Sequence, residues 1–237
     1  LPMTQQLYFE DTYRSSGEAV VLRAWDNGDG TWSVATDQTI FHPQGGGQPT
    51  DTGTMALKGG DGAQFQVSKV SRDRTSGVIV HRGTFSSGES GSFTSGAQVR
   101  QDIDMKARSL HARIHSAGHL LDVAMFRIGQ KLNASKGYHF PKGAYVEYIG
   151  KIDVKQREQV VAGLQKSLDE LVGADIPTVV ETVNSVRTVM VGGREQPCPC
   201  GGTHIRSTKQ LGKVTVTKIK NVKGNARISY KLSSAAV

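Results

Sequence analysis

The sequence is poor in cysteine and aromatic residues and has no long apolar run. Two cysteines in 237 residues are too few for a disulfide-rich secreted fold and indicate a reducing compartment. No stretch approaches the ~20 apolar residues of a membrane-spanning helix, so we expect no membrane association. The N-terminal residues lack the basic-then-apolar layout of a secretory signal peptide. These absences favour a cytoplasmic chain, and its 37% hydrophobic residues suffice for a packed core.

Acidic residues are absent from the C-terminal end of the chain, and this accounts for the net charge. The chain carries 29 Lys and Arg against 21 Asp and Glu, a net charge of +8. Eight of the basic residues lie in 206–237 with no Asp or Glu, so residues 1–205 are neutral. A surface of one sign attracts polyanions, above all the phosphates of nucleic acids. We therefore expect RNA contacts from this end, namely from Lys218, Lys220, Lys223 and Arg227.

The residue pattern predicts an α+β protein of two domains. Residues 1–96 contain short apolar stretches separated by Gly, Asp, Asn and Ser, which is typical of β-strands joined by turns. The run Asn27-Gly28-Asp29-Gly30 predicts a hairpin turn, because Asn and Gly tolerate positive φ. The segment 86–96 is rich in Ser and Gly, and we place the domain boundary after Gly96. Residues 97–237 form the second domain.

The second domain is expected to combine helices and strands. Apolar residues at steps of three and four predict an amphipathic helix over 104–128. A second helix is expected over 154–172, with Asp153 as its N-cap and Gly173 at its end. Strands are predicted over 138–149, 178–183 and 226–232, the last with apolar and polar residues in alternation.

Two pairs of metal-ligating side chains occur in this domain. His115 and His119 lie four residues apart on the first predicted helix, so both imidazoles can reach one point. Cys200 and His204 are separated by Gly-Gly-Thr, whose glycines allow the chain to bend around an ion. Three imidazoles and one thiolate form a donor set that suits tetrahedral Zn²⁺.

The residues themselves leave alternatives to this ligand set. His111 lies one turn before His115, so a His111–His115 pair competes with the pair above. Cys198 competes with Cys200, although the two glycines after Cys200 favour Cys200. A metalloprotease is disfavoured, because Ser116 stands where the HExxH motif has its general base. Buried cysteine and ordinary polar histidines are the alternative to any metal site.

A glycine-rich tract, FHPQGGGQPTDTG, covers residues 41–53. Consecutive glycines allow backbone conformations and close approaches that other residues cannot make. The tract matches neither a dinucleotide-binding fingerprint nor a phosphate-binding loop ending in GK[ST]. From physics alone a plain turn is the favoured interpretation.

The motifs HSAGHLLD, PCPCGGTH and FHPQGGGQPTDTG together resemble the signatures of the AlaX family, freestanding alanyl-tRNA editing proteins similar to the editing domain of alanyl-tRNA synthetase. The resemblance implies a medium-sized member, with a small N-terminal β-barrel before an α+β editing domain whose HxxxH helix packs on antiparallel sheet. It implies zinc ligation by His115, His119, Cys200 and His204. It also implies substrate contacts from Gly45, Gly46, Gly47 and Gln48. Two positions depart from the pattern: His42 replaces a common Tyr, and Gly118 a small hydroxyl residue.

The implied reaction is hydrolysis of the ester that joins serine or glycine to alanine tRNA. Editing is needed because a pocket that admits alanine rejects glycine and serine only weakly. Four protein ligands close the zinc site, so zinc either takes a fifth ligand or shapes the pocket. A vicinal ribose hydroxyl could assist attack by water, and we identify no protein general base. We expect a monomer. The alternatives are a non-enzymatic zinc-stabilised RNA-binding module and an editing hydrolase for another tRNA, such as seryl-tRNA(Thr).

Overall fold

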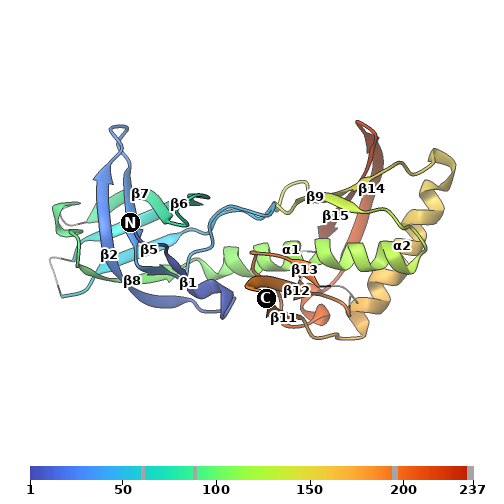
Figure 1. The fold of residues 1–237 in the computed structure, drawn as a ribbon. Coiled ribbons are helices and arrows are strands. Elements are labelled where there is room, and N and C mark those ends of the chain that lie inside the picture. The colour runs from blue at the N-terminus through green and yellow to red at the C-terminus, as the bar shows by residue number, and fades with distance from the viewer. Residues whose placement is uncertain (60–61, 88–89, 194–196, 234–237) are drawn as a thin grey trace. The chain divides into compact units, whose positions relative to one another are not determined.

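A computed structural model describes residues 1–59, 62–87, 90–193 and 197–233 (Figure 1). The chain divides into two compact units. The first comprises residues 1–45 and 49–109, and the second comprises residues 46–48 and 110–237. Each unit encloses its own cluster of buried hydrophobic side chains. Among the described residues, no helix combines the length and apolarity needed to cross a bilayer.

The first unit is a closed β-barrel with the strand order β2-β3-β7-β6-β5-β8. Its strands are β2 (Ser16–Asp26), β3 (Trp32–Thr36), β5 (Gly53–Leu57), β6 (Gln64–Arg72), β7 (Ile79–Ser87) and β8 (Gln98–Ile103). Two short strands, β1 (Gln5–Gln6) and β4 (Gln38–Thr39), pair in parallel beside it. The hairpin turn predicted between β2 and β3 is confirmed, with Gly28 and Gly30 at φ values of 75° and 78°. Alternate strand residues point inward and fill the barrel.

The division between the units lies elsewhere than the boundary expected after Gly96. β8 pairs with both β2 and β5, so the barrel closes only with residues beyond that point. The Ser/Gly-rich segment 86–96 joins two strands of the same barrel, and its Phe93 is only 2% exposed. Residues 88–89 of the segment lie outside the described part of the chain. Its composition marks a loop but does not distinguish a loop within a barrel from a link between domains.

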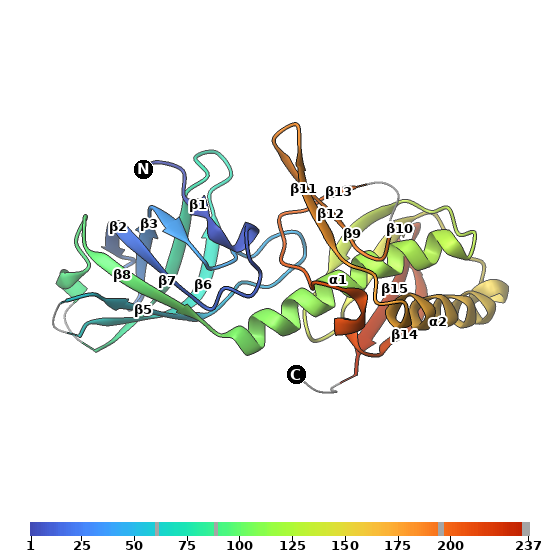
Figure 2. The ribbon, with the colours of Figure 1, turned by 90° about the horizontal axis from the view of Figure 1, so that it is seen from below.

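In its described residues, the second unit combines two α-helices with two antiparallel sheets. The helices are α1 (Met105–Arg127), which begins in the first unit, and α2 (Arg157–Gly173). One sheet has the order β14-β15-β10-β9, with β9 (Ala134–Tyr138), β10 (Tyr145–Ile149), β14 (Val214–Val222) and β15 (Asn225–Leu232). The other contains β11 (Val179–Val183), β12 (Val186–Met190) and β13 (Cys198–Pro199). Figure 2 shows β11 and β12 as a hairpin whose tip extends from the rest of the unit.

The core of this unit lies between the helices and one face of the four-stranded sheet. Leu120 and Leu121 of α1 and Leu164 and Leu168 of α2 are fully buried, as the apolar spacing of these helices requires. They belong to one cluster with sheet residues that include Val146, Ile219 and Ile228. The expected fold class, a β-barrel followed by an α+β region with the HxxxH helix on antiparallel sheet, is confirmed.

The helix bounds agree closely with the sequence prediction, whereas one predicted strand was wrong. Asp153 caps a 3-10 turn (Val154–Gln156) by accepting the Lys155 N–H at 2.9 Å, and α2 continues from it. The single strand expected over 138–149 is instead two antiparallel strands, β9 and β10. The connection between them contains Pro141, which has no N–H to donate, and Gly143, whose φ is 86°. These two residues stop the first strand and reverse the chain.

Candidate metal centre

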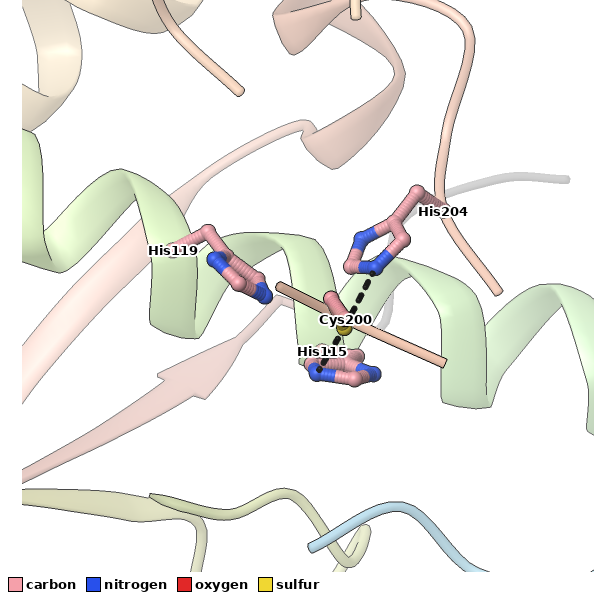
Figure 3. A group of neighbouring side chains, drawn as sticks. All are labelled: His115, His119, Cys200 and His204. Carbon is pink, nitrogen blue, oxygen red and sulfur yellow. Dashed lines mark hydrogen bonds between the residues drawn. The ribbon is translucent and has the colours of Figure 1, made fainter. Parts of the chain in front are cut away.

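His115, His119, Cys200 and His204 converge on one point of the second unit (Figure 3). α1 carries the two helical histidines one turn apart, and the chain after β13 carries the cysteine and the third histidine. The four donor atoms all lie within 4.8 Å of one another. Cys200 Sγ is 3.6 Å from His115 Nε2 and 3.3 Å from His204 Nε2. These are the four residues that were predicted from the sequence as zinc ligands.

These separations match those expected between two ligands of one tetrahedral zinc ion. Zn–S bonds of about 2.3 Å and Zn–N bonds of about 2.0 Å, at a tetrahedral angle, separate sulfur from nitrogen by about 3.5 Å. The two measured S···N distances lie on either side of this value. The donors are also largely withdrawn from water, with His115 and His204 buried. The residues present therefore fit zinc in both number and spacing.

Gln48 determines which nitrogen of His115 faces the centre. The Gln48 side-chain atom that accepts the Thr203 backbone N–H, at 3.0 Å, must be the oxygen Oε1. The same oxygen lies 2.8 Å from His115 Nδ1, so Nδ1 carries the proton and donates it. His115 Nε2 is then unprotonated and directs its lone pair toward the other donors. Gln48 is fully buried, and its Nε2 donates to Thr203 Oγ1 at 2.8 Å.

Ser116 holds the third histidine from the same helix. Its Oγ accepts the Ile205 N–H at 3.2 Å and lies 3.1 Å from His204 Nδ1. The outer nitrogen of His204 is thus engaged, and its Nε2 faces Cys200. Metal-ligating histidines usually have such a partner on the outer nitrogen, because it fixes the ring orientation and the tautomer.

The Cys-Gly-Gly loop is attached to β12 through Arg187. The Cys200 N–H donates to the Arg187 carbonyl at 3.1 Å, and the guanidinium donates to the carbonyls of Cys200 and Gly202 at 2.6 and 3.1 Å. A Cβ on Gly202 would lie 2.2 Å from His115 Cε1, so only glycine lets the loop cross this ring. Gly202 is therefore required because the loop packs directly against the ring of His115, a candidate metal ligand.

Close approach also explains a glycine of the Gly-rich tract. Gly46, Gly47 and Gln48 belong to the second unit, whereas Gly45 belongs to the first. The Gly47 carbonyl accepts the His139 N–H at 2.8 Å, and a Cβ on Gly47 would lie 2.3 Å from the Gly137 carbonyl oxygen. With φ at 79°, Gly47 lets the tract lie against the end of β9, which puts Gln48 beside His115. The substrate contacts expected from the tract stay a prediction.

His139 is a component of the centre that the sequence reasoning missed. Its ring stacks on that of His115, with centroids 4.5 Å apart and planes at 20°. Its Nδ1 donates to the Tyr230 hydroxyl at 2.7 Å, since that hydroxyl donates its own proton to the Ile114 carbonyl. Burial, and to a lesser degree His119, lower the pKa of His139 to about 3. An isolated histidine in a predicted strand carried no signal of this position.

The same ring explains the departure at Gly118. A Cβ at this position would lie 2.4 Å from His139 Cε1 and 3.0 Å from the Tyr230 hydroxyl. The small hydroxyl residue of the family pattern therefore does not fit beside His139. The absence of a side chain at Gly118 on α1 makes room for the His139 imidazole.

Burial shapes the chemistry of the cysteine. It raises the pKa of the Cys200 thiol to about 11, because a buried thiolate loses its hydration. A thiolate at this position therefore needs a cation, which a bound zinc ion would supply. The alternatives left open by the sequence are not part of the group: Cys198 lies in β13 and His111 one turn before His115. Both cysteines are described, and neither forms a disulfide.

The expected RNA contacts lie on the β14–β15 hairpin. Lys218 and Lys220 project outward from β14, and Lys223 is exposed at the turn. Arg227 of β15 donates to Glu147 at 2.6 and 2.9 Å, and its guanidinium lies 4.1 Å from the centre of the Tyr145 ring. Three of the four side chains are therefore solvent-exposed, while the fourth is held by protein neighbours.

Two regions of the chain match known families, and both belong to tRNA synthetases. Residues 18–107, mostly the barrel, match the class II (A) tRNA synthetases. Residues 186–229, which contain Cys200 and His204, match the second additional domain of threonyl and alanyl tRNA synthetases. Both units thus resemble parts of tRNA synthetases, and the resemblance inferred from the three motifs is confirmed.

The curated relatives that the chain matches are alanine–tRNA ligases. The chain is 29% identical over 269 residues to an alanine–tRNA ligase of Halobacterium salinarum, with 100% of the chain and 27% of the relative covered. It is 30% identical over 255 residues to that of Halorubrum lacusprofundi, covering 100% and 26%. For Pyrococcus abyssi the values are 28% over 258 residues, 100% and 27%. The chain is thus similar to alanine–tRNA ligases along its length and spans about a quarter of them.

Proposed function

We propose that this protein is a zinc-dependent deacylase that removes serine or glycine from mischarged alanine tRNA. The observation that carries the proposal is the donor group of three histidines and Cys200, all buried or half-buried, with an outer nitrogen of two histidines held by Gln48 and Ser116. The matches to the second additional domain and to alanine–tRNA ligases support tRNA as the substrate carrier.

The proposed reaction is the hydrolysis of one ester bond. Water adds to the carbonyl carbon of the aminoacyl group, the bond to the ribose oxygen breaks, and free amino acid and a tRNA hydroxyl are released. Bound zinc would supply positive charge that polarises or orients the ester or its amino group. Gln48 holds the His115 ring, and the backbone of Gly46 and Gly47 is the proposed wall for the aminoacyl group. We propose that the vicinal ribose hydroxyl assists the water, so that no side chain acts as base.

The test is a deacylation assay on purified protein loaded with zinc. It measures free amino acid released from seryl-tRNA(Ala), glycyl-tRNA(Ala), alanyl-tRNA(Ala) and seryl-tRNA(Thr). We expect release from the first two and little from alanyl-tRNA(Ala). His119→Ala should abolish both release and zinc binding, whereas His111→Ala, one turn earlier on the same helix, should retain both. Release by a zinc-free His119→Ala protein would disprove the metal's role.

The same assay decides between the two other candidates. The matched domain is named for threonyl as well as alanyl synthetases, so release confined to seryl-tRNA(Thr) would identify a threonine-tRNA editing enzyme. Binding of tRNA without release from any substrate would identify a zinc-stabilised RNA-binding module. The exposed lysines of β14 are the observation that favours this module.

A further inference from the structure

The four-stranded sheet of the second unit has one face in the core and one face outside it. Val146, Ile219 and Ile228 belong to the core face. On each strand, the residues next to these core residues point to the opposite face of the sheet and are exposed or half-buried. Strand register arranges these outward residues in two adjacent rows: Lys218, Ser229, Tyr145 and Tyr138 in one, and Lys220, Arg227, Glu147 and Lys136 in the other.

Aromatic rings form a stacked column on this outward face. Tyr138 stacks on Tyr145, with centroids 5.3 Å apart and planes at 15°. Phe140, just beyond β9, stacks on Tyr138 at 4.5 Å and 16°. The Arg227 guanidinium lies over Tyr145. All three rings are half-buried, although only 6% of the chain is aromatic. Tyr138 and Tyr145 each have stacking neighbours on both faces, so a further flat group can stack on the outer face of Phe140, at the end of the column.

The charge around the column is positive. Lys136, Lys218, Lys220 and Lys231 are exposed on the same face. The carboxylate of this face, Glu147, forms an ion pair with Arg227 at 2.6 Å and is largely buried. Proteins that bind unpaired nucleic acid combine these two features, because phosphates pair with the cations while bases stack on the rings. A duplex hides the faces of its bases, so it could bind this surface only through its phosphates and the lysines.

We propose that this outward face binds an unpaired RNA strand, with a base stacked on Phe140 at the end of the Tyr138–Phe140–Tyr145 column and its phosphates near the lysines of β14. Tyr138 and Phe140 flank His139 in sequence, but His139 points to the opposite face, where it contacts Tyr230 and stacks on His115. The column and the metal centre therefore lie on opposite sides of the sheet, near the end of its edge strand β9. The identification of this strand as the 3′ end of a tRNA rests on the proposed function, but the binding of an unpaired strand does not.

The first test measures binding of the full chain to a labelled, uncharged single-stranded RNA of about 12 nucleotides, within the site sizes typical of such surfaces. Fluorescence anisotropy compares it with a duplex of the same sequence. Phe140→Leu should weaken single-strand binding by roughly 5- to 100-fold, since it removes the ring on which a base stacks. Tyr138→Leu should also weaken it, since it removes the ring that supports Phe140. Tyr138→Phe keeps the ring and should bind like the unmodified protein. Phe126→Leu removes an aromatic ring that is 65% exposed on α1 and is the matched control.

The second test separates stacking from charge. Lys220→Glu should weaken binding and reduce its salt dependence, whereas Lys166→Glu on the exposed side of α2 should change binding less. The Leu variants should leave the salt dependence unchanged. Thermal unfolding, monitored by circular dichroism, checks that each variant is folded.

Three outcomes would overturn the proposal: equal affinity for duplex and single strand, unchanged affinity in a folded Phe140→Leu/Tyr138→Leu double variant, or equal losses in the Phe126→Leu control. Because the probe carries no amino acid, these results do not depend on deacylation. A protein that binds the strand but releases no amino acid contradicts only the proposed function. One that deacylates normally without binding through the column contradicts only this inference.

Discussion

Gln48→Ala should remove the hydrogen bond that holds His115 Nδ1, while all four metal-donating side chains stay in the chain. Gln48 lies in the Gly-rich tract, 67 residues before His115 and 155 before Thr203, and it contacts both. The substitution removes an acceptor that serves two buried donors, His115 Nδ1–H and the Thr203 N–H. It also removes the donor to Thr203 Oγ1.

The size of the effect follows from these contacts. A buried donor left without an acceptor costs about 1–3 kcal/mol, so two of them lower the free energy of unfolding by about 2–6 kcal/mol. With its outer nitrogen unbound, His115 can rotate or change tautomer, and loss of such a partner typically lowers metal affinity about 10- to 100-fold. Gln48→Glu retains an oxygen for both donors, so it should preserve most of the affinity.

Zinc affinity is measured by competition with a chelating dye, and stability by urea denaturation of the zinc-free protein. Gln44→Ala, at an exposed position of the same tract, is the matched control and should change neither quantity. Zinc affinity within twofold of the unmodified protein in folded Gln48→Ala would refute the argument. So would an equal loss in Gln48→Ala and Gln48→Glu, because the carboxylate can still accept both hydrogen bonds.

Three other predictions concern the same centre. Cys200→Ala should lose zinc and deacylation, whereas Cys198→Ala should keep both. Mass spectrometry measures the zinc content of each variant, and equal zinc content in the two would contradict the prediction. Gly202→Ala should displace the His115 ring and lower zinc affinity at least tenfold, because its Cβ would lie 2.2 Å from Cε1. Gly173→Ala, in open space at the end of α2, is its control. Zinc affinity should rise about tenfold per pH unit from pH 7 to 9, since the metal-free Cys200 thiol keeps its proton up to a pKa of about 11 and zinc must displace it. A titration series that is flat in pH would contradict the assignment of a thiolate ligand.

The parts of the structure that were predicted correctly are those determined by short stretches of sequence. The helix over 105–127 follows from apolar residues at steps of three and four, and the same spacing puts His115 and His119 on one face. The turn at Asn27–Gly30 follows from residues that tolerate positive φ. Periodicity and turn chemistry act over a few residues, so one sequence is enough to read them.

Of the predictions that the structure corrected, one depended on partners far away in the chain and one on a local turn. The region 86–96 resembles a linker, yet it joins barrel strands because β8 pairs with β2 and β5. The strand expected over 138–149 is interrupted locally, since Pro141 and Gly143 reverse the chain and its two parts pair with each other. Strand pairing over long separations has no signature in local composition. The division between the units and the strand order of the sheets could therefore not be predicted from the sequence.

For the candidate site, the sequence by itself determined which residues could donate to a metal, because donor chemistry belongs to residue types and their spacing on a helix or loop. Only the tertiary structure decided how these donors are held. It brings Gln48 to His115, Ser116 to His204 across 88 residues, and His139 onto the His115 ring. It also gathers three aromatic rings and several lysines on one sheet face through strand register. These contacts arise from folding of the whole unit, since no local pattern couples residues so far apart.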